Sequence, residues 1–183
     1  MGHRPVVTTI RTRRLELAVL TASFVEAVVS GDLRTAEREL GATLGRQQAG
    51  DPSHLIQLVL ADRAAAEAGY LGVARTIVLT LGSRRRLIGS VGFHGPPDDH
   101  GRLEVSCRIH KAHRGRGYGA ESTTGLIDWA TTRFGVTRFL LAIPPRSEAP
   151  DLVPIEIEPR RATWSAEVEG LANLIEGATR TGW

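Results

Sequence analysis

The sequence predicts a domain of the α+β class (mixed α/β), and three observations carry this prediction. A β-type pattern near the N-terminus is followed by three helical patterns. The pattern then changes from helical to β-rich, and a glycine-rich loop joins the last β-type stretch to a further helix and strand. A length of 183 residues suits one domain. With 42% apolar and 23% charged residues, the composition excludes a wholly disordered chain.

The N-terminal half is expected to hold one strand and three helices. Residues 10–20 alternate apolar and polar side chains from Leu15 onward and predict the first strand, while residues 1–9 are expected to be a flexible end. Thr21 is a suitable N-cap for a helix that ends at Gly31. The other two helical patterns cover residues 33–44 and 54–70.

The second half changes to β-type patterns. Residues 74–81 and 86–93, separated by a Gly-Ser-Arg-Arg turn, predict an antiparallel hairpin, and residues 102–110 supply a third strand. A glycine-rich loop at 115–119 begins a helix whose apolar residues recur every three or four positions. Residues 139–143 form a compact apolar strand after it.

The cysteine count and the basic residues limit the classes of function. Cys107 is the only cysteine, which excludes an internal disulfide framework and a multi-cysteine metal site, so no metal is expected. The 23 basic residues include one lysine, Lys111, so 22 are arginines. Genome base composition can explain this ratio, and a surface for phosphate or carboxylate groups is the functional alternative. Arg84–Arg86 is the only run of three, which is too short to indicate a nucleic-acid partner.

No membrane partner is expected. No stretch approaches the ~18 consecutive apolar residues of a membrane span, and the N-terminus lacks the apolar segment of a signal peptide. The sequence therefore predicts a cytoplasmic protein.

The most informative stretch is the loop Arg114–Ala120, which reads RGRGYGA. Glycines let the backbone come close to a ligand, and the amides and dipole of the helix that follows favour an anion such as phosphate or pyrophosphate. A glycine-rich turn without a ligand is the alternative. The loop lacks the P-loop pattern, its spacing is GxGxG rather than GxGxxG, and the strand 139–143 has no acidic residue. These features argue against a P-loop and a dinucleotide site.

This region resembles a known family. Residues 114–119 match the R/Q-x-x-G-x-G/A acyl-CoA signature of the GNAT N-acetyltransferases. The runs 92–98, 103–105 and 113–121 are similar to the branch that includes the ribosomal-protein N-terminal acetyltransferases, and the resemblance is specific from about residue 86 to 143. It implies the GNAT fold, in which a central, mostly antiparallel sheet is flanked by helices and two strands splay apart to form an acyl-CoA cleft.

The resemblance also implies acetyl-CoA as the cosubstrate and assigns residues to it. The main-chain amides of Arg116, Gly117, Gly119 and Ala120 would hold the pyrophosphate, and the backbone of residues 107–109 would pair with the pantetheine arm. The predicted cofactor-binding residues are Cys107, Arg108, Ile109, Arg114, Gly115, Arg116, Gly117, Tyr118, Gly119 and Ala120.

Acetyl transfer needs a group that takes a proton from the amine, which is mostly protonated at neutral pH. Strand alternation places Glu104 on a polar face of strand 102–110, and the resemblance favours a glutamate on this strand as the base; an ion pair with Arg102 or Arg108 is the alternative. His94 is the second candidate, with a turn histidine as its alternative. Cys107 lies on the apolar face and is expected to be a buried small hydrophobe, so we expect direct transfer without a covalent intermediate.

The chain departs from the family pattern after Ile143. Where the family has an Asn-Ala-Pro-Ser-like segment, Glu148 and Asp151 stand at the Asn and Ser positions, and Pro154 would interrupt a helix beginning there. Residues 164–176 loosely resemble the closing hairpin of the family, and no tyrosine follows that could reprotonate the leaving thiolate.

The sequence thus predicts an acetyl-CoA-dependent N-acetyltransferase acting on a primary amine, either a protein N-terminus or a small molecule. The alternative is a GNAT-fold module that binds acyl-CoA and senses or regulates without turnover. We expect a flexible N-terminus at 1–9 and a single GNAT-like domain at 10–183, atypical over 144–183. A homodimer stays open.

Overall fold

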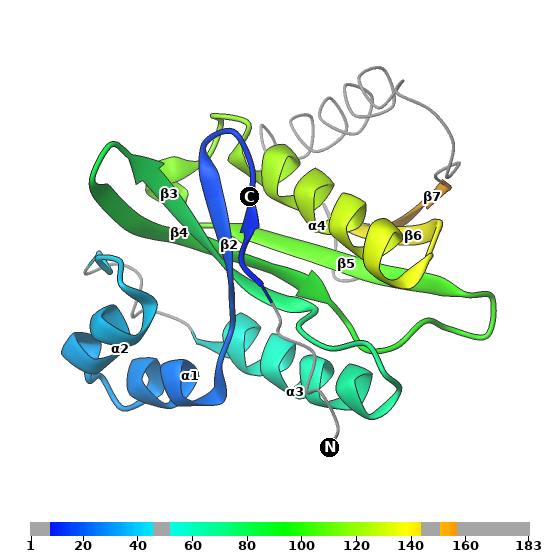
Figure 1. Cartoon of the computed structure of the whole chain (residues 1–183), viewed down its shortest axis with the longest axis horizontal. Helices are drawn as coiled ribbons and strands as arrows, with labels where there is room; N and C mark the ends of the chain where they lie inside the picture. The colour runs from blue at the N-terminus through cyan, green and yellow to red at the C-terminus, as the bar shows by residue number, and fades with distance from the viewer. Residues whose placement is uncertain (1–7, 46–51, 144–150, 157–183) are drawn as a thin grey trace.

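A seven-stranded sheet forms the centre of the computed structural model, which describes residues 8–45, 52–143 and 151–156. The strands lie in the order of the chain, and each is antiparallel to the next except β5 and β6, which are parallel. Helices cover both faces of the sheet, α1, α2 and α3 on one and α4 on the other (Figure 1). The α+β class and the GNAT arrangement predicted from the sequence are therefore confirmed.

The bounds of the elements follow. The strands are β1 (Ile10–Arg11), β2 (Leu15–Val19), β3 (Ala74–Leu81), β4 (Arg84–Phe93), β5 (Arg102–Ile109), β6 (Arg138–Ile143) and β7 (Asp151–Glu156). The helices are α1 (Ala22–Val29), α2 (Leu33–Leu40), α3 (Ser53–Glu67) and α4 (Tyr118–Phe134), with a 3-10 turn, η2, at Lys111–His113.

The predicted first strand is divided in two. Thr12 closes a turn after β1, since its amide donates to the carbonyl of Leu15 and its hydroxyl accepts from the amide of Leu15. The two short strands then pair with each other as a small hairpin. The alternation from Leu15 onward was correct for β2, but the polar residues before it bend the chain back.

The boundaries of the first helices follow their capping residues. Thr21 caps α1 as predicted, and its hydroxyl accepts from the amide of Phe24 at 3.2 Å. Helix α2 ends at Leu40, four residues before the predicted end, because Gly41 takes a left-handed conformation with φ 62°. The turn of the central hairpin is also shorter than predicted, since β4 already begins at Arg84.

The core lies on both faces of the sheet. On the α4 side, Leu126 and Ile127 pack with apolar residues of β2 to β6, and on the other side Phe24 and Leu58 pack with residues such as Leu87. The apolar face of β5 belongs to the α4 side and is buried along its whole length (Leu103, Val105, Cys107, Ile109). The polar face of β5 therefore points toward α3.

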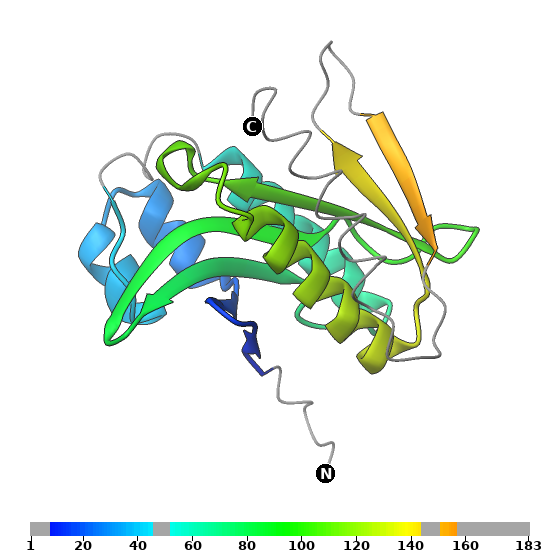
Figure 2. The ribbon, with the colours of Figure 1, turned by 90° about the horizontal axis from the view of Figure 1, so that it is seen from above.

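Strands β5 and β6 pair over only part of their length. Their parallel register runs from Arg102 opposite Arg138 to Val105 opposite Leu141, and β5 continues to Ile109 without β6 beside it. Figure 2 shows β6 and β7 turning away from the rest of the sheet. The predicted divergence of these two strands is thus present.

The segment after β6 differs from the family pattern, as the sequence suggested. Asp151 begins strand β7, and Pro154 lies within it opposite Leu140. Proline is compatible with an edge strand, because its missing N–H can face away from the neighbour. Glu148 and the predicted hairpin at 164–176 lie outside the described residues. Within the described ranges, none of the helices has the length and apolar character to cross a membrane.

Candidate active site

The glycine-rich loop places open backbone amides at the start of α4. Gly115 and Gly117 have φ angles of 70° and 73°, a left-handed conformation that favours glycine. Gly117 is the N-cap residue of α4, and no side chain makes a capping hydrogen bond there. The first amides of a helix need acceptors, and an anion supplies them. The loop therefore fits the pyrophosphate of acetyl-CoA.

The charges around the loop also fit an anion. The pKa of His110 is lowered to about 4, chiefly by burial and also by the nearby His113, Arg108 and Arg114. Burial and two arginines likewise lower the pKa of His113. Within the described part of the chain, the Nδ1 atoms of both histidines are buried and have no hydrogen-bond partner. The arginines that help lower these pKa values make the surroundings of the loop positive, and a bound polyanion would offset that charge.

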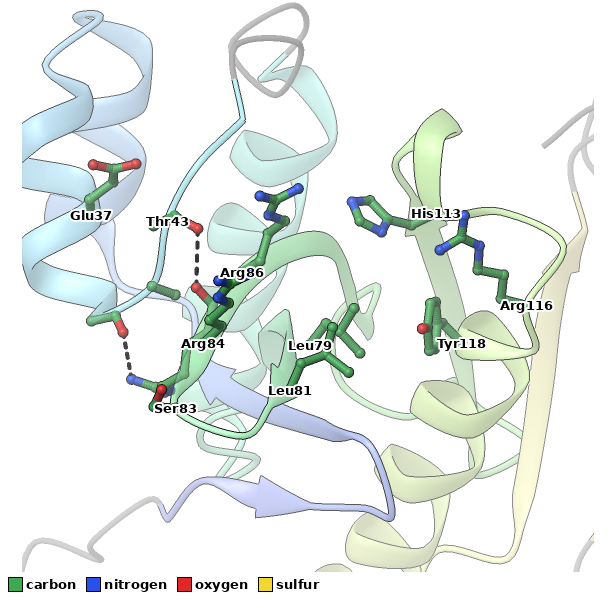
Figure 3. Close-up of a pocket in the computed structure, with 13 residues that line it drawn as sticks. Glu37, Thr43, Leu79, Leu81, Ser83, Arg84, Arg86, His113, Arg116 and Tyr118 are labelled. Carbon is green, nitrogen blue, oxygen red and sulfur yellow. Dashed lines mark hydrogen bonds between the residues drawn. The ribbon is translucent and has the colours of Figure 1, made fainter.

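A cleft of about 910 Å³ opens between the loop and the tip of the β3–β4 hairpin. Figure 3 shows its two sides, with Leu79 and Leu81 facing Tyr118, and His113 beside Arg116. The wall formed by β4 adds two further cations (Arg84 and Arg86). An apolar floor with a basic rim suits a ligand that has both a flat apolar part and negative charge.

The side chain of Arg114 is hydrogen-bonded to the end of β5. Its Nε donates to the carbonyl of Ile109 at 2.8 Å, which ties the loop to the end of the strand. Among the residues that the structure describes, Cys107 to Ile109 have a strand partner on one edge only, which is β4. The opposite edge of these residues is the one that would meet a pantetheine arm. The carbonyl of Ile109 already accepts the hydrogen bond from Nε of Arg114.

Cys107 is not placed for nucleophilic chemistry. It is 5% exposed, and its Sγ lies 3.4 Å from the hydroxyl of Ser122 and 3.9 Å from the carbonyl of Gly119. Burial raises the pKa of the thiol to about 11, so it stays protonated at neutral pH. The prediction of a buried small hydrophobe is confirmed.

Glu104 lies at the base of the divergence between β5 and β6. It is half-buried, opposite Leu140 and one residue before the last pair of the two strands. Arg102, one of the two ion-pair partners that the sequence offers, pairs instead with Asp98 at 2.8 Å. The carbonyl of Glu104 accepts from the amide of His94 at 2.9 Å, so the backbone of His94, directly after the end of β4, lies beside that of Glu104.

A chain of hydrogen bonds that the sequence did not reveal runs along the same face. The Nε2 atom of His94 lies 2.6 Å from the hydroxyl of Ser106, which lies 3.2 Å from Nε2 of His54. The Nδ1 atom of His54 lies 2.7 Å from the hydroxyl of Ser90. Strand alternation places Ser90 and Ser106 on one face, but no local pattern connects His54 of α3 with β4 and β5.

The sequence is similar to those of known acetyltransferases. The family described as "Acetyltransferase (GNAT) domain" matches residues 54–149, which are 96 of the 183 residues. The uncharacterized N-acetyltransferase YjdG of Bacillus subtilis (strain 168) is 40% identical over 52 residues, which cover 28% of this chain and 31% of that protein.

Two solved structures are similar in architecture. The crystal structure of an acetyltransferase from Agrobacterium tumefaciens C58 is 23% identical, covers 80% of each chain and has a TM-score of 0.50. The ribosomal-protein-S5-alanine acetyltransferase from Vibrio fischeri is 18% identical, covers 78% of this chain and 77% of that chain, and has a TM-score of 0.47. The family match extends from the start of α3 past the glycine-rich loop to the end of β6, and the chain therefore belongs to the GNAT family of acetyltransferases, which use acetyl-CoA.

Proposed function

We propose that this protein transfers the acetyl group of acetyl-CoA directly to a primary amine, in a complex that holds both substrates. The observation that carries the proposal is the edge of β5 after Val105, which leaves β6 and leads to the loop before α4. A backbone edge next to uncapped helix amides offers an extended arm its hydrogen bonds and a diphosphate its acceptors at the same time.

The cofactor-binding residues follow from this edge and loop. The amides of residues 116–120 would hold the diphosphate, Gly115 and Arg114 would shape the loop, and residues 107–109 would pair with the pantetheine arm. The basic cleft beside Tyr118 and Arg116 has the charge and the apolar floor to receive the nucleotide end of the cosubstrate. When bound, acetyl-CoA supplies the activated acyl group.

Glu104 is the favoured proton acceptor. An amine with a pKa near 10 must lose a proton before it can attack a thioester, and a positioned base is worth ~10²–10⁴ in rate. A carboxylate at the base of the β5–β6 divergence would lie close to the position that the backbone edge assigns to the acyl group. His94, directly after the end of β4, is the second candidate. The buried, neutral Cys107 supports direct transfer rather than an acyl-enzyme.

The test combines calorimetry with a thiol-release assay. Binding is measured with CoA, and turnover with acetyl-CoA plus either a peptide with a free α-amine or 1,4-diaminobutane. We expect Glu104→Gln to lower kcat about 100-fold without changing the affinity for CoA, and the exposed Glu26→Gln of α1 to change neither. The absence of binding heat with CoA would refute the proposal.

A second function keeps the fold and the ligand but omits turnover. Acidic residues at Glu148 and Asp151, where the family has neutral groups, favour a module that binds acyl-CoA and senses it. Binding of CoA with no thiol release from either amine would support this alternative. The cytoplasmic location, the protein or small-molecule nature of the acceptor, and the single domain at 10–183 stay predictions.

A further inference from the structure

The hydrogen-bonded chain beneath the acceptor side of β5 links three elements that lie far apart in the sequence. Ser90 belongs to β4, Ser106 to β5 and His54 to the first turn of α3, while His94 follows the end of β4. Both serines are buried, 3% and 9% exposed, whereas His94 is exposed. The hydrogen-bonded chain therefore begins at Ser90 inside the protein and ends at His94 on its surface.

When the hydroxyl hydrogen of Ser106 bonds to one of the two histidines, the hydrogen-bonded chain can run in two directions. A neutral imidazole has one donor and one acceptor nitrogen, and a hydroxyl donates one hydrogen. His54 is the second residue of α3, where the partial positive charge of the helix start favours an uncharged ring. If His54 donates from Nδ1 to Ser90, its Nε2 accepts from Ser106, and the Ser106 oxygen accepts from Nε2–H of His94. The reverse direction places the hydrogen of His94 on Nδ1.

The two directions differ in what His94 can do. In the first, Nδ1 of His94 carries a lone pair and can accept a proton. An ammonium group then gives one proton to Nδ1, which leaves the free amine and an imidazolium whose Nε2–H stays bonded to Ser106. In the reverse direction Nδ1 already carries hydrogen, and the ring cannot act as a base.

We propose that His54 is a positioning residue that acts through Ser106 to hold His94 in the tautomer with a free Nδ1. The inference rests on the proposed function and takes its second candidate, His94, rather than Glu104, as the group that accepts the proton of the amine. Without His54, the hydroxyl of Ser106 loses its acceptor and turns its hydrogen to Nε2 of His94, which moves the ring hydrogen to Nδ1. A wrong tautomer of this kind disables a histidine base although its position is kept.

Nitrogen-15 NMR of histidine-labelled protein tests the tautomer without any substrate. His94→Gln and His54→Gln identify the two sets of signals among the six histidines. We expect His94 of the wild type to carry its hydrogen on Nε2, and the Nδ1–H form to become the larger fraction in His54→Ala. Ser106→Thr keeps a hydroxyl at the same point and should preserve the wild-type pattern. A wild-type His94 with hydrogen on Nδ1, or no change of tautomer in His54→Ala, overturns the inference.

Kinetics provide the second readout. We expect His54→Ala and Ser106→Ala each to lower kcat at least 10-fold, with KM for acetyl-CoA unchanged, and Ser106→Thr to restore most of kcat. Because the residues act in one chain, His54→Ala combined with His94→Ala should lose no more than His94→Ala alone. The control is Gln57→Ala, an exposed position of α3 that should leave kcat unchanged.

The two proposals fail in different ways. If the wild type binds CoA but releases no thiol with the peptide or the diamine, the proposed function fails, and the NMR result still decides the tautomer. If the wild type turns over and His54→Ala has the kcat of the wild type, the positioning role of His54 is refuted while the proposed function stands.

Discussion

Replacement of Gly115 by alanine separates the role of the loop backbone from its stability. Gly115 has φ 70°, and a Cβ atom there would meet nothing within 4 Å. The left-handed conformation costs a residue with a side chain about 1–2 kcal/mol, and a less flexible unfolded chain offsets part of it. Gly31, with φ 76° and the same open space, provides a matched control far from the loop. For a protein of this size, each kcal/mol lowers Tm by about 2–4 °C, and both variants should show the same decrease.

Only Gly115→Ala should weaken binding of CoA. The strain at position 115 is relieved by rotation of the neighbouring peptide planes, which turns at least one amide away from the diphosphate. A hydrogen bond to a charged group is worth about 1.5–3 kcal/mol, so the Kd should rise about 10- to 150-fold. Differential scanning calorimetry gives Tm, and titration with CoA gives Kd. Equal Kd values in Gly115→Ala, Gly31→Ala and the wild type would refute the assignment of the diphosphate to these amides.

Three further predictions concern groups around the site. Burial raises the pKa of the Cys107 thiol to about 11, so a disulfide reagent at pH 8 should label it only after unfolding. The stability that the protonated thiol contributes is present below its ordinary pKa of 9.0 and is lost as the pH rises toward 11. Burial raises the pKa of Glu121, but hydrogen bonds that include those from Arg14 outweigh burial and lower it. Glu121→Gln should therefore cost about 1–2 kcal/mol at pH 7 in urea unfolding, and this loss should shrink as the pH falls below the ordinary value of 4.5 through the lower folded pKa; an equal loss at pH 3 would contradict the reasoning. Gly92→Ala would place a Cβ 2.7 Å from Cδ2 of Leu58 and should destabilise the protein by about 1–3 kcal/mol, with normal Tm as the contrary result.

The fold was predictable where a local pattern decides the local structure. Thr21 marks the start of α1, the β-rich composition of residues 74–81 marks β3, and the alternation over residues 102–109 marks β5, because capping, composition and strand periodicity act within a few residues. The predictions were wrong where a distant contact decides. Arg84 and Arg85 showed no apolar pattern, yet they belong to β4, because β3 supplies a complete row of partners opposite them.

The candidate site also has one part that a local sequence pattern predicts and one part that depends on distant contacts. The cofactor is expected to meet mainly main chain, and a chain that must expose its amides needs glycines at fixed positions, which a sequence shows directly. The family match covers the loop, while the assignment of its amides to the cofactor stays a prediction. By contrast, the chain from His54 to His94 exists only because α3 lies across β4 and β5, and each of its four residues is ordinary in its own segment.

The cofactor and the acceptor would be recognised by different parts of the protein, the cofactor by main-chain groups and the acceptor by side chains. If the cofactor meets the backbone edge of β5 and the amides of α4, as proposed, substitutions of side chains on the polar face of β5 should leave cofactor binding unchanged. Glu104 and Ser106 lie on that face, and their partners come from the end of β4 and from α3. Residues around this face would then decide which amine is accepted, whereas a change in the loop would weaken the reaction for every acceptor. Because Ser106 supports a proton acceptor that both amines need, Ser106→Ala should lower kcat in the same proportion for the peptide and the diamine, as should Gly115→Ala at a fixed concentration of acetyl-CoA. A loss confined to one amine in Ser106→Ala would show that Ser106 acts on the acceptor itself and not through His94.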